Sequence, residues 1–177
     1  QWLKDLGMNG AQVKRAILAC PQLIALTLVG NLKPRVQWLK ELGMDDSQVV
    51  KTIANFPQLT CCSLEENLKP MVQWMKSLGM DDSQVAKTMT NFPSLMGYSL
   101  EVNLKPKVQA LRDYDFADKQ IVRVLSTFPA LLGLSSNRWA HRLSVLQASG
   151  VVAKTMTKHP QLMSYSLEEN VKPRQRR

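Results

Sequence analysis

The sequence is poor in the residues that build catalytic and metal-binding sites. Its 177 residues include only two histidines and three cysteines, which are Cys20, Cys61 and Cys62. This odd number, with two cysteines adjacent, fits neither a zinc site nor a disulfide framework, and it favours a reducing, intracellular compartment. The two histidines have no cysteines or carboxylates at ligand spacing, so we expect no metal and no other cofactor.

Long apolar runs and catalytic motifs are also missing. No apolar run approaches the roughly 18–20 residues of a membrane span, so we expect no membrane partner. The sequence has no nucleophile–base arrangement, no glycine-rich phosphate loop and no paired catalytic carboxylates. We therefore expect a protein without enzymatic activity. Hydrophobic residues make up 45% of the chain, which is enough to fill a folded interior.

What the sequence does contain is an internal repeat of 36 residues. Prolines mark the period at Pro21, Pro57, Pro93 and Pro129, and Pro160 follows after a shorter gap of 31 residues. The phrase Asn-Leu-Lys-Pro recurs at 31–34, 67–70 and 103–106. A period of this length predicts a solenoid in which each unit buries its apolar face against its neighbours.

The repeat predicts one helical domain over residues 1–177, without a second core. We expect units near 1–21, 22–57, 58–93, 94–129 and 130–160, and a partial unit over 161–177. The chain begins and ends inside a unit, so we expect a trimmed piece of a longer protein.

Each unit reads as two helices and a short turn. Asp81 and Gln84 form the pattern of a capping box at a helix start. Val85, Met89 and Phe92 then follow at helical spacing, until Pro93 ends the helix. We expect a second helix to begin near Asn67 and to end at Gly79, and a 3₁₀ or single α turn over 63–66. No strand pattern competes, so the fold class is an all-α solenoid.

The formal net charge of +9 points to an anionic partner, and its cations recur at fixed positions of the repeat. We call one set the basic column: Arg15, Lys51, Lys87, Arg123 and, across a deletion, Lys154. We call another set the basic stripe, a basic–amide–basic trio on one helix face: Lys33, Gln37 and Lys40; Lys69, Gln73 and Lys76; Lys105, Gln109 and Arg112. Lys172 continues the stripe, and Arg174 lies in a basic tail. We expect all of these residues to contact nucleic acid, with the stripe favoured.

A second interpretation treats the periodic charge as a solvated surface. Acidic residues recur too, for example Asp45 with Asp81, which suits helix capping rather than binding. Trp2, Trp38 and Trp74 form an aromatic column, which we expect to pack between units rather than to stack on bases. These features keep a protein-binding helical scaffold open as an alternative function.

The repeat pattern resembles that of the mTERF family, the mitochondrial transcription termination factors and their plastid relatives. The matching residues in the second and third units are Pro57, Leu59, Ser63-Leu64-Glu65, Asn67-Leu68-Lys69-Pro70, Val72, Met75, Leu78-Gly79-Met80 and Val85. The resemblance implies a curved solenoid of about five units, each with two α-helices and one 3₁₀ helix. It also implies an organelle location, mitochondrion or chloroplast, and a basic groove for double-stranded DNA or structured RNA.

Together these observations predict a nucleic-acid-binding repeat protein of organelle gene expression. We favour double-stranded DNA binding with a role in transcription termination or its regulation. The alternatives are an RNA-binding factor in rRNA maturation or splicing, and a scaffold with a protein partner. We expect a monomer.

Overall fold

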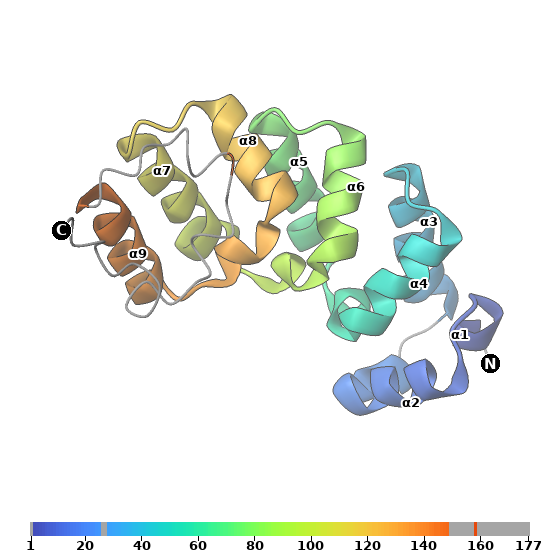
Figure 1. Ribbon diagram of the computed structural model, residues 1–177. Coiled ribbons are helices and arrows are strands. Elements are labelled where there is room, and N and C mark those ends of the chain that lie inside the picture. Colours follow the sequence, from blue (N-terminus) through green and yellow to red (C-terminus); the bar gives the residue numbers. More distant parts are fainter. Residues whose placement is uncertain (1, 26–27, 149–157, 159–177) are drawn as a thin grey trace. The chain divides into compact units, whose positions relative to one another are not determined.

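The computed structural model describes residues 2–25, 28–148 and 158, and every regular element in these ranges is a helix. The chain divides into two compact units, residues 1–100 and 101–177, which are described one at a time. Figure 1 follows the helices along the chain. The expectation of a single continuous domain over 1–177, with the unit boundaries given above, stays a prediction.

The first unit, residues 1–100, repeats one succession of elements. Its α-helices are α1 (Trp2–Asp5), α2 (Gly10–Ala19), α3 (Lys33–Glu41), α4 (Asp46–Asn55), α5 (Lys69–Ser77) and α6 (Asp82–Asn91). Its 3₁₀ helices are η1 (Pro21–Ile24), η3 (Pro57–Cys61) and η5 (Pro93–Gly97). Short π-helical turns precede the second helix of each repeat, at η2 (Leu28–Leu32) and η4 (Leu64–Leu68).

The second unit continues the same order of elements. The π-turn η6 (Leu100–Leu104) leads into α7 (Lys105–Asp113), α8 (Asp118–Thr127), the 3₁₀ helix η7 (Pro129–Gly133) and α9 (Ser136–Ala148). The repeated pair of α-helices with a 3₁₀ helix confirms the predicted fold class.

One detail of the prediction was wrong. The 3₁₀ helix begins at the proline, at Pro57–Cys61, and the segment after Ser63 is a π-turn instead. The Ser63 side chain caps this turn by accepting from the Glu66 amide at 3.1 Å. The amides of Asn67 and Leu68 both donate to the Ser63 carbonyl at 3.1 Å, which widens the turn. As a result α5 begins at Lys69, two residues later than expected.

The turn between the two helices of a repeat is closed at both helix ends. Gly79 has a φ of 99°, and its amide and that of Met80 donate to Lys76 and Met75 at the end of α5. This is a Schellman motif, which needs a left-handed residue. Asp81 then accepts from the Gln84 amide at 2.8 Å, and Gln84 accepts from the Asp81 amide at 3.0 Å. The predicted capping box and helix stop are thus confirmed.

The second unit keeps this turn with different residues. Asp115 takes the glycine position and has a φ of 62°. Its amide and that of Phe116 donate to Arg112 and Leu111, so the Schellman motif survives. Aspartate tolerates the left-handed region better than most residues. Ala117 offers no side-chain acceptor at the start of α8, so only the bond from its amide to Gln120 remains, at 2.9 Å.

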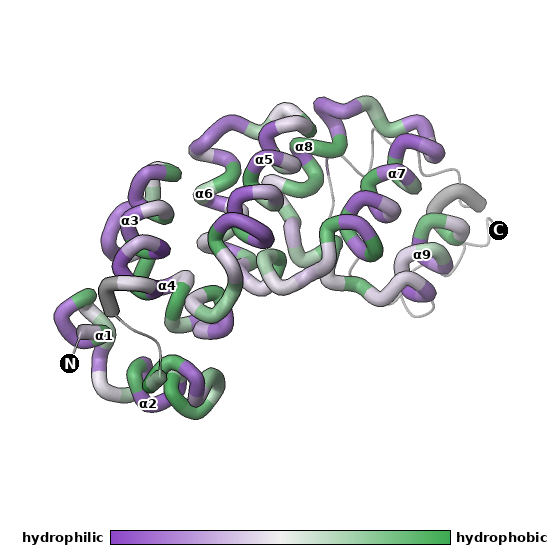
Figure 2. Tube along the Cα trace, turned by 180° about the vertical axis from the view of Figure 1, so that it is seen from behind, coloured by the Kyte–Doolittle hydropathy of each residue, from purple (hydrophilic) through white to green (hydrophobic). Residues whose placement is uncertain are grey.

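The core runs between successive repeats. In the first unit α4 contacts α2 and α6, and η3 contacts η1 and η5. Equivalent residues of successive repeats fill these contacts: Val49 and Val85 are 0% exposed, and Leu59 and Leu95 at most 1%. Each such burial contributes about 1.5–3 kcal/mol. Figure 2 shows hydrophobic and hydrophilic residues alternating along each helix, as this packing requires.

The tryptophan column is part of this packing. Trp38 and Trp74 are 8% and 9% exposed, and Trp2 is half-buried. The expectation that these rings pack in the fold is therefore met by Trp38 and Trp74, and neither ring offers a free face to a base.

We predict that Gly97→Ala destabilises the first unit by about 1–3 kcal/mol. A Cβ at Gly97 would lie 2.9 Å from Cζ of Phe56, a ring packed from the preceding repeat. The backbone there is outside the left-handed region, so the effect comes from space alone. Chemical denaturation measures the change in the free energy of unfolding.

Gly10→Ala is the matched control, because nothing lies within 4 Å of a Cβ at this first residue of α2. It should raise stability by about 0.4–1 kcal/mol through the lost flexibility of the unfolded chain. Equal effects of the two substitutions would contradict the packing of Phe56 on Gly97.

Candidate nucleic-acid interface

The structure places the basic stripe on the surface of α3, α5 and α7. Its members are exposed apart from Lys69, which is half-buried. The helix register explains this, since the residues stand at i, i+4 and i+7 opposite the apolar face. The three trios therefore form exposed basic faces within their own units, as the sequence predicts.

Most of the cations in the stripe already have a carboxylate partner. Across the turn of each repeat, Lys40 pairs with Asp46 at 2.6 Å, Lys76 pairs with Asp82, and Arg112 pairs with Asp118 at 3.0 Å. Each of these aspartates is the first residue of the capped helix, where it also suits the helix dipole. The ion pairs thus join the two helices of one repeat.

The N-terminal end of the stripe is paired as well. Lys69 contacts Glu65 and Lys105 contacts Glu101, both at 2.5 Å and both one helical turn apart. Lys33 has Val29 at the position of these glutamates, so it lacks this partner. The amides of Gln37 and Gln109 donate to Glu41 at 3.3 Å and Asp113 at 2.9 Å. The positive potential of the stripe is therefore largely compensated.

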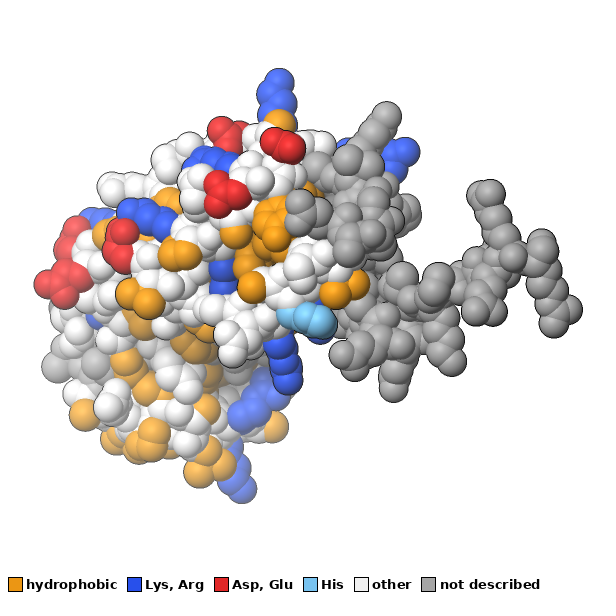
Figure 3. Space-filling view, turned by 90° about the vertical axis from the view of Figure 1, so that its left-hand side faces the viewer, with side chains coloured by type: hydrophobic (Ala, Val, Ile, Leu, Met, Phe, Trp, Pro, Cys, Tyr) orange, Lys and Arg blue, Asp and Glu red, His pale blue; other side chains and the backbone are white. Residues whose placement is uncertain are grey.

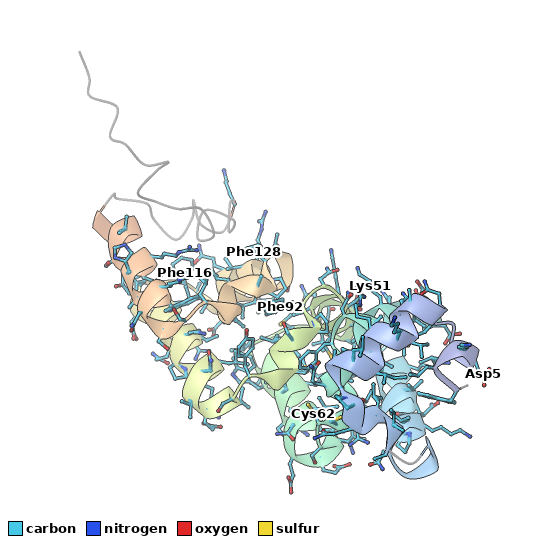
Figure 4. All side chains as sticks on the ribbon, turned by 90° about the horizontal axis from the view of Figure 1, so that it is seen from below. Asp5, Lys51, Cys62, Phe92, Phe116 and Phe128 are labelled. Atoms are coloured by element: carbon cyan, nitrogen blue, oxygen red, sulfur yellow. The ribbon has the colours of Figure 1, made fainter. Side chains whose placement is uncertain are left out.

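The basic column has a different surrounding. Arg15 on α2, Lys51 on α4, Lys87 on α6 and Arg123 on α8 are all exposed. Among the residues that the structure describes, none of these four takes part in an ion pair. Arg15 only donates to the Ala54 carbonyl, at 3.4 Å. Figure 4 shows Lys51 at the outer edge of the first unit, away from Cys62.

A groove lies beside the basic column, between α4 and α6. It has a volume of about 600 Å³, and Lys51 and Lys87 both line it. Its other polar residues include Ser47, Ser83, Asn91 and Asp82, whose carboxylate pairs with Lys76. Hydroxyl and amide groups at this place can donate hydrogen bonds to phosphate oxygens, as such groups do at nucleic-acid backbones. Figure 3 shows one face of the molecule, where some Lys and Arg side chains lie beside Asp and Glu side chains and others have none in view.

Three predicted contact residues, Lys154, Lys172 and Arg174, lie outside the described residues. Within the described part of the chain, no cluster of three or more potential metal ligands occurs. No helix of that part is long and apolar enough to cross a membrane.

Two basic residues that the sequence analysis did not single out act inside the fold. Arg35, the third residue of α3, donates to the Cys62 carbonyl at 3.0 and 2.7 Å and to the Asn31 carbonyl at 2.6 Å. Lys107 has the equivalent place in α7, is 3% exposed and donates to the Leu132 carbonyl at 2.6 Å. Arg35 reaches the residue that follows the 3₁₀ helix η3, and Lys107 reaches a carbonyl within the 3₁₀ helix η7. The sequence held a signal for this role, because the equivalent position of α5 is occupied by Met71, an apolar residue typical of a buried position.

The folded chain is an all-α helical-repeat protein with periodic basic side chains on its surface. It belongs to the mTERF family, whose model matches residues 1–177, the whole chain. Proteins of this family are generally non-enzymatic, nucleic-acid-binding repeat proteins of organelles, so membership indicates a nucleic-acid-binding protein. No curated protein matched the chain.

The buried Lys107 predicts a pH dependence of stability. Burial lowers the pKa of Lys107 from its ordinary value of 10.5. Between the folded and unfolded pKa values the unfolded chain binds more protons, so the free energy of unfolding rises with pH in that window. Lys107→Met, which copies Met71, removes this contribution. Relative to this variant, the wild type should gain stability as the pH is raised from 7 toward about 10.5.

Denaturation at a series of pH values measures this difference. Lys119→Met removes one positive charge from an exposed position of α8 and serves as the control. A difference between wild type and Lys107→Met that stays constant, or that falls with pH, would contradict the assignment.

Proposed function

We propose that this protein binds double-stranded nucleic acid, with DNA favoured over structured RNA, through its basic column. The observation that carries the proposal is that Arg15, Lys51 and Lys87 recur on successive capped helices and form no ion pair with a carboxylate of the described residues. Phosphate contacts supply most of the non-specific affinity for a duplex, and they need cations that are free to neutralise charge. The family supports nucleic acid as the ligand.

The spacing of the column suits a phosphate backbone. Packed helices lie roughly 8–10 Å apart. Phosphates along one strand follow each other at about 3.4 Å. Cations on neighbouring capped helices would therefore meet about every third phosphate. Near-identical repeats present the same side chains each time, which favours recognition of shape and backbone over a base code.

The basic stripe has a secondary role in this proposal. Its lysines would have to leave Asp46, Asp82, Glu65 or Glu101 to reach a phosphate. Exposed ion pairs contribute only about 0–1 kcal/mol, so a phosphate can replace the carboxylate as the partner of a lysine. Each such replacement leaves an unpaired carboxylate near the phosphate, which opposes binding. Lys33, without a glutamate one turn earlier, is the member best suited to bind.

In the cell, occupancy of a duplex can block or recruit the transcription machinery. We therefore propose a role in transcription termination or its regulation in a mitochondrion or chloroplast. A preference for structured RNA in binding measurements would instead assign the protein to rRNA maturation or splicing.

The test compares two charge-removing double variants of the first unit. Lys51→Gln with Lys87→Gln should weaken binding to a labelled DNA duplex at least roughly tenfold and should reduce the salt dependence by about one unit of log–log slope per lysine. Lys40→Gln with Lys76→Gln removes the same charge from ion-paired positions and should weaken binding less than about threefold. Fluorescence anisotropy gives both affinities.

The two outcomes that contradict the proposal are distinct. A larger loss from the Lys40 and Lys76 variant would move the contact surface to the basic stripe. Absence of binding by the wild type to duplex DNA and duplex RNA at low salt would favour the scaffold with a protein partner.

A further inference from the structure

Two cysteines from neighbouring repeats meet in the first unit. Cys20 lies between the end of α2 and the start of η1, and Cys61 is the last residue of η3. Their sulfur atoms are 2.9 Å apart, and both are free thiols. The residues are 41 positions apart, so only the packing of one repeat on the next brings them together. The cysteine spacing in the sequence gave no sign of this pair.

The same junction one repeat later is filled in another way. Phe56 stands 36 residues after Cys20, and Gly97 stands 36 residues after Cys61. The Phe56 ring lies against Gly97 so closely that a Cβ there would be 2.9 Å away. A large and a very small residue are thus replaced by two residues of intermediate size at the first junction. Packing needs only the volume, and it does not need two thiols in contact.

We infer that Cys20 and Cys61 form a reversible intramolecular disulfide that links the first two repeats. A disulfide has a sulfur–sulfur distance of about 2.03–2.05 Å, so the two atoms need to approach by only about 0.9 Å. Both residues lie at helix ends, where small shifts of the backbone disturb no helix interior. The inference does not depend on the proposed nucleic-acid binding.

Cys62 is placed differently from Cys61. Its thiol donates to the Gln58 carbonyl at 3.4 Å, within its own 3₁₀ turn. Its carbonyl oxygen accepts two bonds from Arg35, at 3.0 and 2.7 Å, which hold the backbone of this residue. Cys62 is therefore engaged by Gln58 and Arg35, and Cys61 is the cysteine that contacts Cys20.

The oxidant that the step needs is a low-molecular-weight disulfide such as oxidised glutathione. Cys61, the less buried thiol, loses its proton and attacks one sulfur of the small disulfide, which breaks that bond and releases one thiolate. Cys20 loses its proton and attacks the sulfur of Cys61, which releases the second thiolate. The two protein thiols lose two electrons and two protons, and the small disulfide becomes two thiols.

The surroundings of Cys20 affect the rate of disulfide closure through the pKa of its thiol. Burial raises the pKa of Cys20, and in the free dithiol Cys61 raises this pKa further through a hydrogen bond and through its charge. Once Cys61 is held in the mixed disulfide it has no thiol proton and no charge, so burial is the cause that remains when Cys20 attacks. Because the thiolate is the attacking species, closure should become faster as the pH rises through 7 toward 9. The bond is thus suited to slow equilibration with the thiol pool of its compartment.

The disulfide would act at the junction between the first two repeats that the structure describes. The bond would close a loop between the first and second repeats, which restricts the unfolded chain. It would also fix the C-terminal end of α2, the helix that carries Arg15, against η3.

The experiment equilibrates the protein in buffers with graded ratios of oxidised to reduced glutathione, followed by alkylation, digestion and mass spectrometry. We expect a crosslink between the Cys20 peptide and the Cys61–Cys62 peptide in the wild type, retained in Cys62→Ser and lost in Cys61→Ala. Alanine is the residue at the equivalent position 25, so the Cys61→Ala variant should fold, which circular dichroism checks. A crosslink retained in Cys61→Ala, or only mixed disulfides with glutathione in the wild type, would overturn the inference.

A second readout follows the consequence of the bond. The thermal midpoint of oxidised wild type and of oxidised Cys62→Ser should exceed that of the same proteins after reduction, with no such difference in Cys61→Ala. An unchanged or lowered midpoint in the crosslinked protein would show that the bond strains the junction, and it would overturn the idea of a link that holds the repeats together.

Discussion

The turn that joins the two helices of each repeat is the constraint on which the rest depends. A Schellman motif at Gly79 and a capping box at Asp81 close the two helix ends. The ion pair between Lys76 and Asp82 spans the same turn. Closing the turn in this way holds the apolar faces in register, so that each repeat can bury them against its neighbours. It also engages one cation of the basic stripe at each of three turns, namely Lys40, Lys76 and Arg112.

The basic column owes its different character to the same turn. Lys51 and Lys87 lie in the second half of the capped helices, and neither forms an ion pair with a residue that the structure describes. The groove between α4 and α6 opens beside them. The residues that shape the repeat and those that remain available to an anion are thus separated along one helix. The residues at equivalent junctions differ, with Cys20 and Cys61 at one and Phe56 and Gly97 at the next. Nearly identical repeats therefore pack against each other through different side chains.

Local signals predicted the parts of the fold that local chemistry decides. Asp81, Gln84 and Gly79 identified the helix ends because caps depend on neighbours three to five residues away. The exposure of the stripe followed from helix periodicity. The partners Asp46, Asp82 and Asp118 did not follow, because their pairing depends on how the chain turns between two helices. The π-turn after Ser63 was missed for a similar reason, since one carbonyl accepts two amides there. The contact of Cys20 with Cys61 depends on repeat packing, which no local pattern contains.

The salt dependence of duplex DNA binding by the wild-type chain tests the central claim most directly. Anisotropy titrations at several salt concentrations give the slope of log affinity against log salt. Neutralisation of one phosphate by each of Arg15, Lys51 and Lys87 of the first unit predicts a slope of about −2.7. A slope near zero, or no binding at about 50 mM salt, would contradict the account, because a column of unpaired cations on a phosphate backbone must release counterions.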